Sequence, residues 1–481
     1  MKRRFDNVKT KKRKIKQILM IFIAIILLFS IYLNTFLLIK YNVLPLKYLI
    51  IYFVLVGFIP FVLIYFTVFP RIKPLLKNIL AIIEVIYILL LFIVFSYLNQ
   101  TFNFLDDFTS GFKYETKNYY VLVASDNKYD EINDLNNKSI GYASGLDISV
   151  NHAIEKIDDI ITLNHVEHDG FSLMLNELYD GTLDSILIVQ SYYDLLTEND
   201  ETIEENTKII YKFSIKEKVN EIVKDVDVTK ENFNVYVSGI DSYGNVTDKT
   251  RSDVNIVMSV NPVTNKILMI NIPRDYYVEL DGFAQKDKLT HAGMYGVEVS
   301  AKTIENLLGI EINYYVKVNY NALIKLVDAL GGVNVYSKYA FNTHENHYPI
   351  REGYNYVNGE KALDFVRTRK AFLDGDRVRG ENQQAMIKAI IEKASDVSIL
   401  LKYDEILKSL DGSFSTNIST NKIMSLVNMQ LDSMPSWKID SVSLNGSDAH
   451  GLTYTYPGQE LYIMIPDEAV LEDVKNKLDN M

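Results

Sequence analysis

The sequence predicts a membrane-anchored α/β protein in three parts: three N-terminal transmembrane helices, an α/β accessory domain, and a C-terminal layered α/β/α domain. Three observations predict it. Three apolar runs near the N-terminus are each long enough to span a bilayer. The residues after them alternate strand-like and helix-like patterns. The chain has 481 residues and is 48% apolar, which suffices for a membrane part and folded cores together.

The three apolar runs cover residues 15–39, 46–69 and 75–98, and each exceeds the ~20 residues that a spanning helix needs. Residues 1–17 carry nine Lys or Arg against one Asp, and further basic residues lie between the second and third runs. Because basic residues concentrate on the cytoplasmic side, the N-terminus is expected in the cytoplasm and everything after residue 100 outside the cell membrane. Residues 1–100 therefore form a basic tail and three transmembrane helices.

Composition excludes several classes of function. The chain has no Cys, which excludes disulfides, thiolate metal sites and a cysteine nucleophile. Its formal net charge is -11 even though the N-terminal tail is basic, so the remainder is more acidic still and a nucleic-acid partner is not expected.

The accessory domain is predicted at residues 112–220. Buried strands are expected at 119–125, 139–144 and 185–190, with a helix at 149–157. This stretch resembles part of a periplasmic solute-binding domain. A polar connector is expected before it, at 101–116, and the lysine-rich stretch 215–230 is expected to be a charged helix or linker after it.

The C-terminal domain is predicted at residues 231–481. Strands are expected at 233–240, 254–260 and 266–272, followed by an amphipathic helix at 297–308. Further strands at 314–318 and 333–336 flank a helix at 322–332 that ends in glycine. Alternation of this kind predicts a layered domain.

Two aspartates end neighbouring strands of this domain. Asp241 follows the first strand and Asp253 opens the next, so both carboxylates can meet at one edge of the sheet. That is a suitable place for Mg²⁺, which takes carboxylate and phosphate oxygens. The alternative is that both residues cap turns, as Asp often does.

Arginines cluster at later element ends. Arg274 follows a strand through a stiff proline turn, and Arg367 and Arg369 share a face only if the chain is extended there. Asp376, Arg379 and Gln383 line one face of a predicted helix. Two guanidinium groups about 6 Å apart repel by roughly 3 kcal/mol, so convergence would need carboxylates or a bound anion; otherwise each arginine is surface decoration.

These motifs together resemble the LytR-CpsA-Psr family. The resemblance covers about residues 233–398 and rests on SGID, TRSDVNIV, IPRD, DALGGV, VRTRK and D-x-x-R-x-x-x-Q, in that order. The three spans and the extra domain look like the capsular polysaccharide members of streptococci and their relatives. The resemblance implies a central mixed sheet in the layered domain.

The resemblance also implies an activity. A polyprenyl-pyrophosphate-linked glycopolymer, capsular polysaccharide or a related wall polymer, would be transferred to a muramic acid hydroxyl of peptidoglycan through a phosphodiester bond. Mg²⁺ or Mn²⁺ would be the cofactor. The other expected partners are the lipid bilayer and membrane proteins of capsule synthesis. Two alternatives are a polyprenyl-pyrophosphate phosphatase and a non-catalytic sensor of capsule synthesis.

By the same resemblance, each site residue takes an implied role. Asp241 and Asp253 match the metal ligands, and Asp376 is a candidate general base or a partner of Arg379. Asn382 stands where many relatives carry arginine. The positions that match the pyrophosphate site are Arg251, Arg274, Lys288, Arg367, Arg369, Arg379 and Gln383, of which Arg274, Arg367, Arg369 and Arg379 would also act in catalysis.

Overall fold

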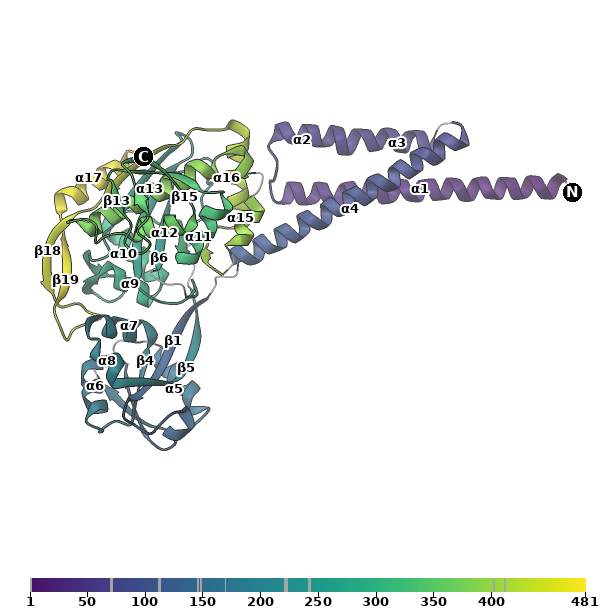
Figure 1. The fold of residues 1–481 in the computed structure, drawn as a ribbon. Coiled ribbons are helices and arrows are strands. Elements are labelled where there is room, and N and C mark those ends of the chain that lie inside the picture. The colour runs from purple at the N-terminus through teal and green to yellow at the C-terminus, as the bar shows by residue number, and fades with distance from the viewer. Residues whose placement is uncertain are drawn as a thin grey trace.

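The protein consists of a helical bundle, a small α/β unit and a larger α/β/α unit (Figure 1). The computed structural model describes residues 2–69, 72–110, 114–144, 147, 149–168, 170–219, 224–240, 244–400, 403–410 and 412–481. In Figure 1 the bundle projects to the right of the large unit, and the small unit lies below the large unit. We call the small unit the accessory unit and the large one the core unit.

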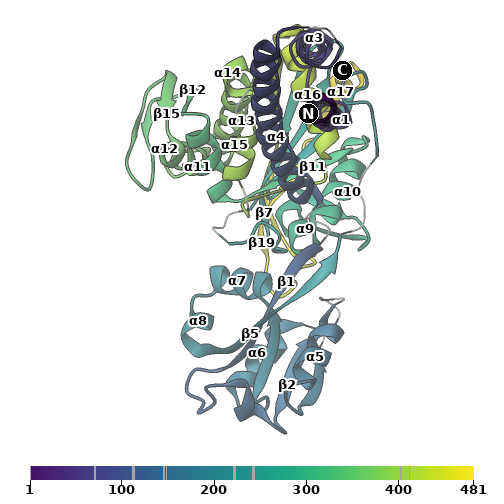
Figure 2. The ribbon, with the colours of Figure 1, turned by 90° about the vertical axis from the view of Figure 1, so that its right-hand side faces the viewer.

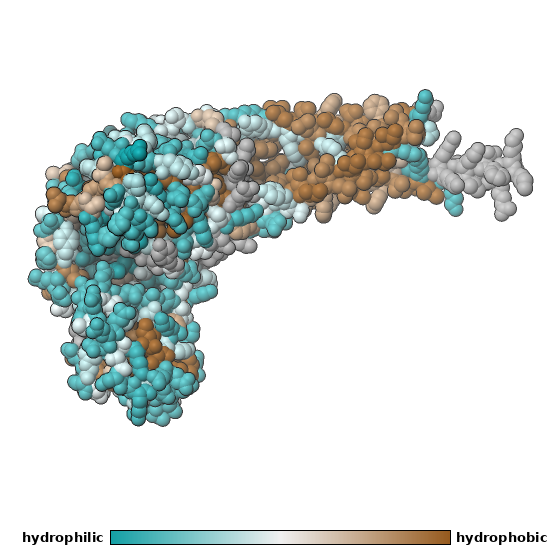
Figure 3. Space-filling model, viewed as in Figure 1, coloured by the Kyte–Doolittle hydropathy of each residue, from teal (hydrophilic) through white to brown (hydrophobic). Residues whose placement is uncertain are grey.

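The bundle confirms the three predicted spans. Helices long and apolar enough to cross a membrane cover Lys14–Lys40, Leu46–Val68 and Pro74–Asp106. They form a continuous hydrophobic band in the space-filling view (Figure 3). The elements are α1 (Lys2–Lys40), α2 (Leu46–Tyr52), a π-helical turn (Phe53–Phe58), α3 (Ile59–Val68) and α4 (Pro74–Ser110).

Buried polar side chains inside the bundle form hydrogen bonds between helices. Asn34 donates to the carbonyl oxygen of Leu91 at 3.0 Å, and Thr67 donates to the buried Glu84 at 2.7 Å. Such pairing is required where no water can reach a polar group. The N-terminus and the folded units lie at opposite ends of the bundle, as an odd number of crossings demands (Figure 1).

The polar connector predicted at 101–116 is wrong. Helix α4 continues to Ser110, and the first strand already begins at Tyr114. The extension of α4 packs on the core unit, because Phe102 stacks on Tyr41 with 4.0 Å between ring centroids and both cluster with the fully buried Met424. The prediction failed because the apolar residues that make this contact are interspersed with polar residues in the sequence.

The accessory unit is one five-stranded sheet with helices packed on it. Its strand order is β3-β2-β4-β1-β5; β2 is parallel to β3 and β4, and β1 is antiparallel to β4 and β5. The elements are β1 (Tyr114–Ala124), β2 (Ser139–Ala143), α5 (Val150–Asp158), β3 (Asn164–His168), α6 (Phe171–Tyr179), β4 (Ser185–Val189), α7 (Gln190–Asn199), α8 (Thr202–Asn206) and β5 (Thr207–Lys218), with a 3-10 turn at Ile132–Leu135.

The stretch 215–230 is not a helix at its start. Residues 215–218 are the end of β5, a strand at the edge of the sheet. Lysines are common on edge strands because they discourage pairing with other chains. The expected charged helix or linker therefore begins as an edge strand over residues 215–218.

The core unit is built on a six-stranded mixed sheet, as predicted. Its order is β16-β11-β6-β7-β8-β17. Strand β11 is parallel to β6 and β17 is parallel to β8, whereas β7, between β6 and β8, is antiparallel to both. The strands are β6 (Phe233–Ile240), β7 (Ser252–Asn261), β8 (Lys266–Asn271), β11 (Tyr314–Val318), β16 (Phe414–Thr416) and β17 (Lys438–Ser443).

Helices cover both faces of this sheet and make three layers. On one face Tyr236 and Ile270 pack with Ile304 and Val474, from helices α10 (Val297–Leu308) and α17 (Glu468–Asp479). On the other, Val235 lies with residues of α13 (Gly375–Ala394) and α16 (Thr420–Ser433). Alternate residues of each strand therefore serve different layers.

The remaining elements lie around the sheet. Strand β12, predicted among the strands of the domain, pairs only with β15 in a separate ribbon. The elements are β9 (Tyr277–Leu280), β10 (Gln285–Lys288), α9 (Leu289–Tyr295), α11 (Tyr320–Ala329), β12 (Val333–Ser337), β13 (Phe341–Asn342), β14 (Pro349–Ile350), β15 (Gly353–Val357), α12 (Gly359–Arg367), α14 (Val397–Leu400), α15 (Tyr403–Ser409), β18 (Gly446–Gly451) and β19 (Leu461–Pro466).

The two units lie next to each other (Figure 2), and buried polar contacts join them. Glu115 of β1 accepts from Lys317 of β11 at 2.8 Å, and both are buried. The backbone of Thr116 exchanges hydrogen bonds with Thr247 and Lys249, each at 2.8 Å. A buried pair of this kind fixes orientation, because separating it would strand both charges.

Candidate active site

A cavity of about 290 Å³ lies where the ends of β6, β7, α12 and the start of α13 meet. We call it the arginine pocket. Seven of the predicted site residues line it: Arg251, Asp253, Arg274, Arg367, Arg369, Arg379 and Gln383. Motifs separated by up to 130 residues in the chain thus converge on one cavity.

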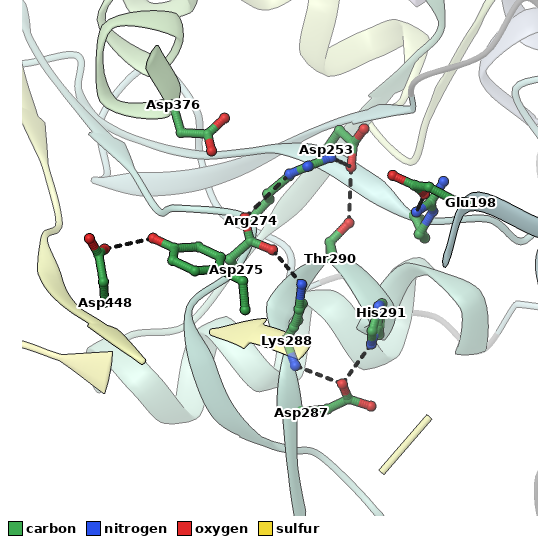
Figure 4. A network of polar contacts seen from close by, with 12 residues as sticks. Glu198, Asp253, Arg274, Asp275, Asp287, Lys288, Thr290, His291, Asp376 and Asp448 are labelled. Atoms are coloured by element: carbon green, nitrogen blue, oxygen red, sulfur yellow. Dashed lines mark hydrogen bonds and ion pairs between the residues drawn. The ribbon is translucent and has the colours of Figure 1, made fainter. Parts of the chain in front are cut away.

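Arg274 and Asp253 pair directly in the pocket (Figure 4). Arg274 Nη1 lies 3.2 Å from Asp253 Oδ1, and Thr290 Oγ1 donates to the same oxygen at 3.1 Å. The two side chains come from the strand ends of β7 and β8, which are neighbours in the sheet. The turn at Pro273 places Arg274, and the contact with Asp253 fixes that placement further.

A chain of charged groups supports this pair from behind. Arg274 Nε lies 3.4 Å from Asp275, which in turn pairs with Lys288 at 2.9 Å. Lys288 is thus one step removed from the pocket and is not among its lining residues. Further back, Asp287 pairs with His291 at 2.6 Å. Although burial raises the pKa of Asp287, His291 and Thr455 hold it below its usual value.

Arg367 and Arg369 meet the condition for sharing a face. Helix α12 ends at Arg367, and Thr368 is extended with φ -66° and ψ 118°. Both guanidinium groups line the pocket. Arg367 also lies over the ring of Tyr320, 4.5 Å from its centroid, which holds the side chain by a cation–π contact.

Helix α13 presents Arg379 and Gln383 to the pocket from one face, as predicted. Asp376 pairs with Arg379 at 3.0 Å and lies 3.9 Å from Arg369. The helix approaches closely, since a Cβ on Gly375 would lie 2.4 Å from the carbonyl oxygen of Arg369.

Asn382 points elsewhere on the same helix. Its amide nitrogen lies 3.4 Å from the carbonyl oxygen of Phe365, and its side chain is buried away from the pocket. The position therefore serves helix packing in this chain.

The pocket carries an excess of positive charge. Burial lowers the pKa of Arg379, and Arg274 and Arg369 lower it further, so that Asp376 and Asp253 offset these effects only in part. Arg274 is different: burial lowers its pKa, but Asp253 and Asp275 outweigh this and the pKa lies above its ordinary value. Charges of one sign that remain under-compensated in a cavity favour a bound anion.

One wall comes from the accessory unit, which sequence reasoning did not foresee. Glu198 of α7 lines the pocket and pairs with Arg251. Sequence analysis also missed Thr290, Tyr320 and Asp275. Asp275 lies inside the IPRD motif, but its role as a partner of Arg274 and Lys288 was not predicted. Glu198 offered a fainter signal, since it follows Gln190 and Asp194 at helical intervals of four.

A second, apolar cavity of about 550 Å³ adjoins the arginine pocket. It lies between the sheet and helices α13 and α16, and Met258, Ile387 and Leu426 are among its lining residues. The two cavities share five wall residues: Val254, Val318, Leu323, Val366 and Gln383.

Of the two predicted metal ligands, only Asp253 can be placed. Asp241 lies outside the described residues. Among the residues that the structure describes, no three His, Asp or Glu side chains cluster as a metal site. The donor chemistry at Asp253 nevertheless fits Mg²⁺, because its carboxylate faces an anion pocket, and this ion combines few carboxylates with phosphate oxygens and water.

Comparison with known proteins identifies one family. The LytR_cpsA_psr family model matches residues 186–479 and so begins within β4 of the accessory unit. The chain is 32% identical over 268 residues to the polyisoprenyl-teichoic acid–peptidoglycan teichoic acid transferase TagT of Bacillus subtilis, covering 54% of this chain and 79% of TagT. It is 30% identical over 257 residues to TagU of Bacillus subtilis, covering 53% and 80%.

Among solved structures, that of Bacillus subtilis TagV covers 52% of this chain and 97% of its own length. The two sequences are 30% identical, and the TM-score is 0.45.

Proposed function

Because the chain belongs to the LytR-CpsA-Psr family, we propose that it is a membrane-anchored transferase that moves a polyprenyl-pyrophosphate-linked glycopolymer onto peptidoglycan through a phosphodiester bond. The glycopolymer would be capsular polysaccharide or a related wall polymer. The observation that carries the proposal is the shared wall between the arginine pocket and the apolar cavity. A polyprenyl pyrophosphate has the matching form, an anionic head joined to a long apolar chain.

The arginines would hold the pyrophosphate. Guanidinium forks match phosphate oxygens, and Arg251, Arg274, Arg367, Arg369 and Arg379 all face the pocket. Gln383 lies on the wall shared with the apolar cavity, where head and chain of the donor would meet. The polyprenyl chain of the donor would lie along Met258 and Ile387 in the apolar cavity.

The reaction is a phosphoryl transfer. An acceptor hydroxyl oxygen forms a bond to the phosphorus that carries the glycan, the bond from that phosphorus to the bridging oxygen breaks, and polyprenyl phosphate leaves. Charge on the departing phosphate is neutralised by the arginines, and such positioning and neutralisation supply most of the catalysis. Asp376 is our candidate for accepting the hydroxyl proton, and its contacts with Arg379 and Arg369 keep it at the pocket's edge.

Magnesium would be held by Asp253 together with Asp241. When bound, the ion supplies further neutralisation of the pyrophosphate charge. Asp253 itself is positioned by Arg274 and Thr290, so its carboxylate has a fixed direction.

The proposed orientation puts the N-terminus in the cytoplasm and both folded units outside. It rests on the basic residues at the N-terminal end of the bundle, which lies opposite the folded units (Figure 1). On that side lipid-linked pyrophosphates and peptidoglycan are both within reach.

The test is transfer by the full chain in lipid nanodiscs, with a polyprenyl-pyrophosphate oligosaccharide, Mg²⁺ and soluble peptidoglycan fragments. Asp253→Ala and Arg367→Ala should abolish the product, whereas Arg351→Ala, at an exposed arginine outside the pocket, should not. Transfer that survives both pocket substitutions would sink the proposal. Turnover with water alone would indicate the phosphatase, and donor binding without turnover the sensor.

A further inference from the structure

A third cavity, of about 100 Å³, lies between the accessory and core units. Asn118, Gln190, Ser191 and Asp194 form its accessory wall. The other wall is the chain leading into β7, with Arg251 and Asp253. We call this the inter-unit cavity.

The inter-unit cavity adjoins the arginine pocket. The two share Ile240, Arg251 and Asp253 as lining residues. The apolar cavity shares five other residues with the arginine pocket and none with the inter-unit cavity. The arginine pocket therefore lies between an apolar neighbour and a polar one.

Helix α7 supplies a polar stripe to this arrangement. Gln190, Asp194 and Glu198 are spaced by four residues and so share one helical face. The first two line the inter-unit cavity and the third lines the arginine pocket. The stripe thus runs from one cavity into the other.

Ser191 is the independent sign of a ligand. Its side chain is 3% exposed, it lines the inter-unit cavity, and its hydroxyl has no hydrogen-bond partner among the described residues. Such a buried hydroxyl costs stability unless something else occupies its bonding capacity.

The helix is held firmly at this place. Tyr192 OH lies 2.9 Å from Tyr295 OH, which lies 3.0 Å from Thr455 Oγ1. These contacts tie α7 to the core unit, and the Glu115–Lys317 pair ties β1 to it as well. A wall fixed in this way can position a ligand.

We propose that the inter-unit cavity binds the hydroxyl-bearing edge of the acceptor sugar, so that the accessory unit completes the acceptor site of the transferase. This rests on the proposed function. Hydroxyl, amide and carboxylate groups are those that recognise a neutral sugar, and Ser191, Asn118 and Asp194 supply one of each.

The geometry of the reaction favours the acceptor over the donor glycan. Attacking and leaving oxygens lie roughly in line across the phosphorus. The leaving polyprenyl phosphate is held on the side of the apolar cavity, so the hydroxyl must approach from the other side. Its oxygen forms the new bond to the glycan-bearing phosphorus, the bond to the bridging oxygen breaks, and the hydroxyl proton passes to a carboxylate.

The experiment measures initial transfer rates by the full chain in nanodiscs against peptidoglycan-fragment concentration, at saturating donor. Asp194→Asn and Ser191→Val are compared with Glu205→Gln, an exposed carboxylate on α8. In the first two variants we expect the KM for the acceptor to rise about tenfold and the KM for the donor to stay unchanged. Asp194→Asn removes a hydrogen bond to a charged group, and Ser191→Val blocks the acceptor sterically.

The outcomes separate the two proposals. If the unsubstituted chain transfers glycan and neither variant changes the acceptor KM, the acceptor site is wrong and the transferase stands. An equal rise in donor KM would also refute it. No transfer to peptidoglycan by the unsubstituted chain would refute the proposed function itself. Should Asp194→Asn not fold, Ser191→Val decides alone.

Discussion

The arginine pocket and the apolar cavity share strand β7 and helix α13, yet their chemistry is opposite. Strand β7 gives Asp253 to the pocket and Met258 to the cavity, and helix α13 gives them Arg379 and Ile387. The pocket lies where these elements begin, and the cavity lies along their middles. Element ends can carry charge because they meet neighbours with free backbone groups and water, whereas sandwiched middles cannot.

The largest effect is expected on the polar side. Arg379→Ala should lower transfer by about a hundredfold, the cost of removing one donor from a developing anion. Thermal stability should not fall, because burial and Arg274 already lower the pKa of this guanidinium and its charge is a burden to the ligand-free fold. Transfer assays and thermal unfolding of the same preparation check both statements. A large loss of stability together with activity would show that Arg379 is structural.

A bulky substitution should break the apolar side alone. Ile387→Trp fills space in the cavity, and excluding two methylenes at about 0.8 kcal/mol each raises the KM for a long-chain donor about tenfold. A donor with a chain of only two isoprene units should be affected much less. Kinetics with both donors measure the difference, and Ile465→Trp, at an exposed isoleucine, is the matched control. Equal losses with both donors would place the chain elsewhere.

The single tryptophan reports on the apolar side directly. Trp437 lines the cavity and is partly exposed, with its indole nitrogen bonded to Gln430 at 2.9 Å. Polyprenyl phosphate should displace water from the indole and shift its emission to the blue, whereas inorganic pyrophosphate should not. Fluorescence titration with each ligand checks this. A shift with pyrophosphate alone would reverse the assignment of the two cavities.

The smallest expected effect is on the pH dependence of thermal stability. Only the polar side should show it, because no titratable side chain is among the described lining of the apolar cavity. Burial raises the pKa of Asp194 above 3.8, although Arg251 and Lys212 oppose this. The contribution of Asp194 to stability is therefore fully present below pH 3.8 and is lost as pH rises through the folded pKa of Asp194. Asp194→Asn should raise Tm slightly near neutral pH and leave it unchanged in acid. A gain that persists in acid would contradict this cause.

The difference between the two cavities also explains what the sequence could predict. Asp253, Arg274 and Arg379 stand out because charged residues at successive element ends are unusual, and seven of the predicted residues line one pocket. Met258 and Ile387 carry no such signal, since apolar residues in a strand or helix belong to the core by default. The cavity they line is a gap in packing, which periodicity does not reveal.

Elements were missed for physical reasons of their own. The lysines at the end of β5 were expected in a charged helix or linker because charge density outweighed the alternation of Ile215 and Glu217 with exposed neighbours. The continuation of α4 to Ser110 depends on contacts with Met424, more than 300 residues away in the chain. Glu198 reaches the pocket only because two units dock, which no local pattern encodes.

Helix α16 faces in two directions. Leu426 and Met429 line the apolar cavity, while Met424 and Thr420 lie against the end of α4, where Thr420 is 3.0 Å from Thr109. A fragment cut free of its membrane helices would bare the flank of the element that walls the cavity. Such a fragment should aggregate, and its cavity should be distorted. Lipid affinity should therefore be measured with the whole chain in a bilayer.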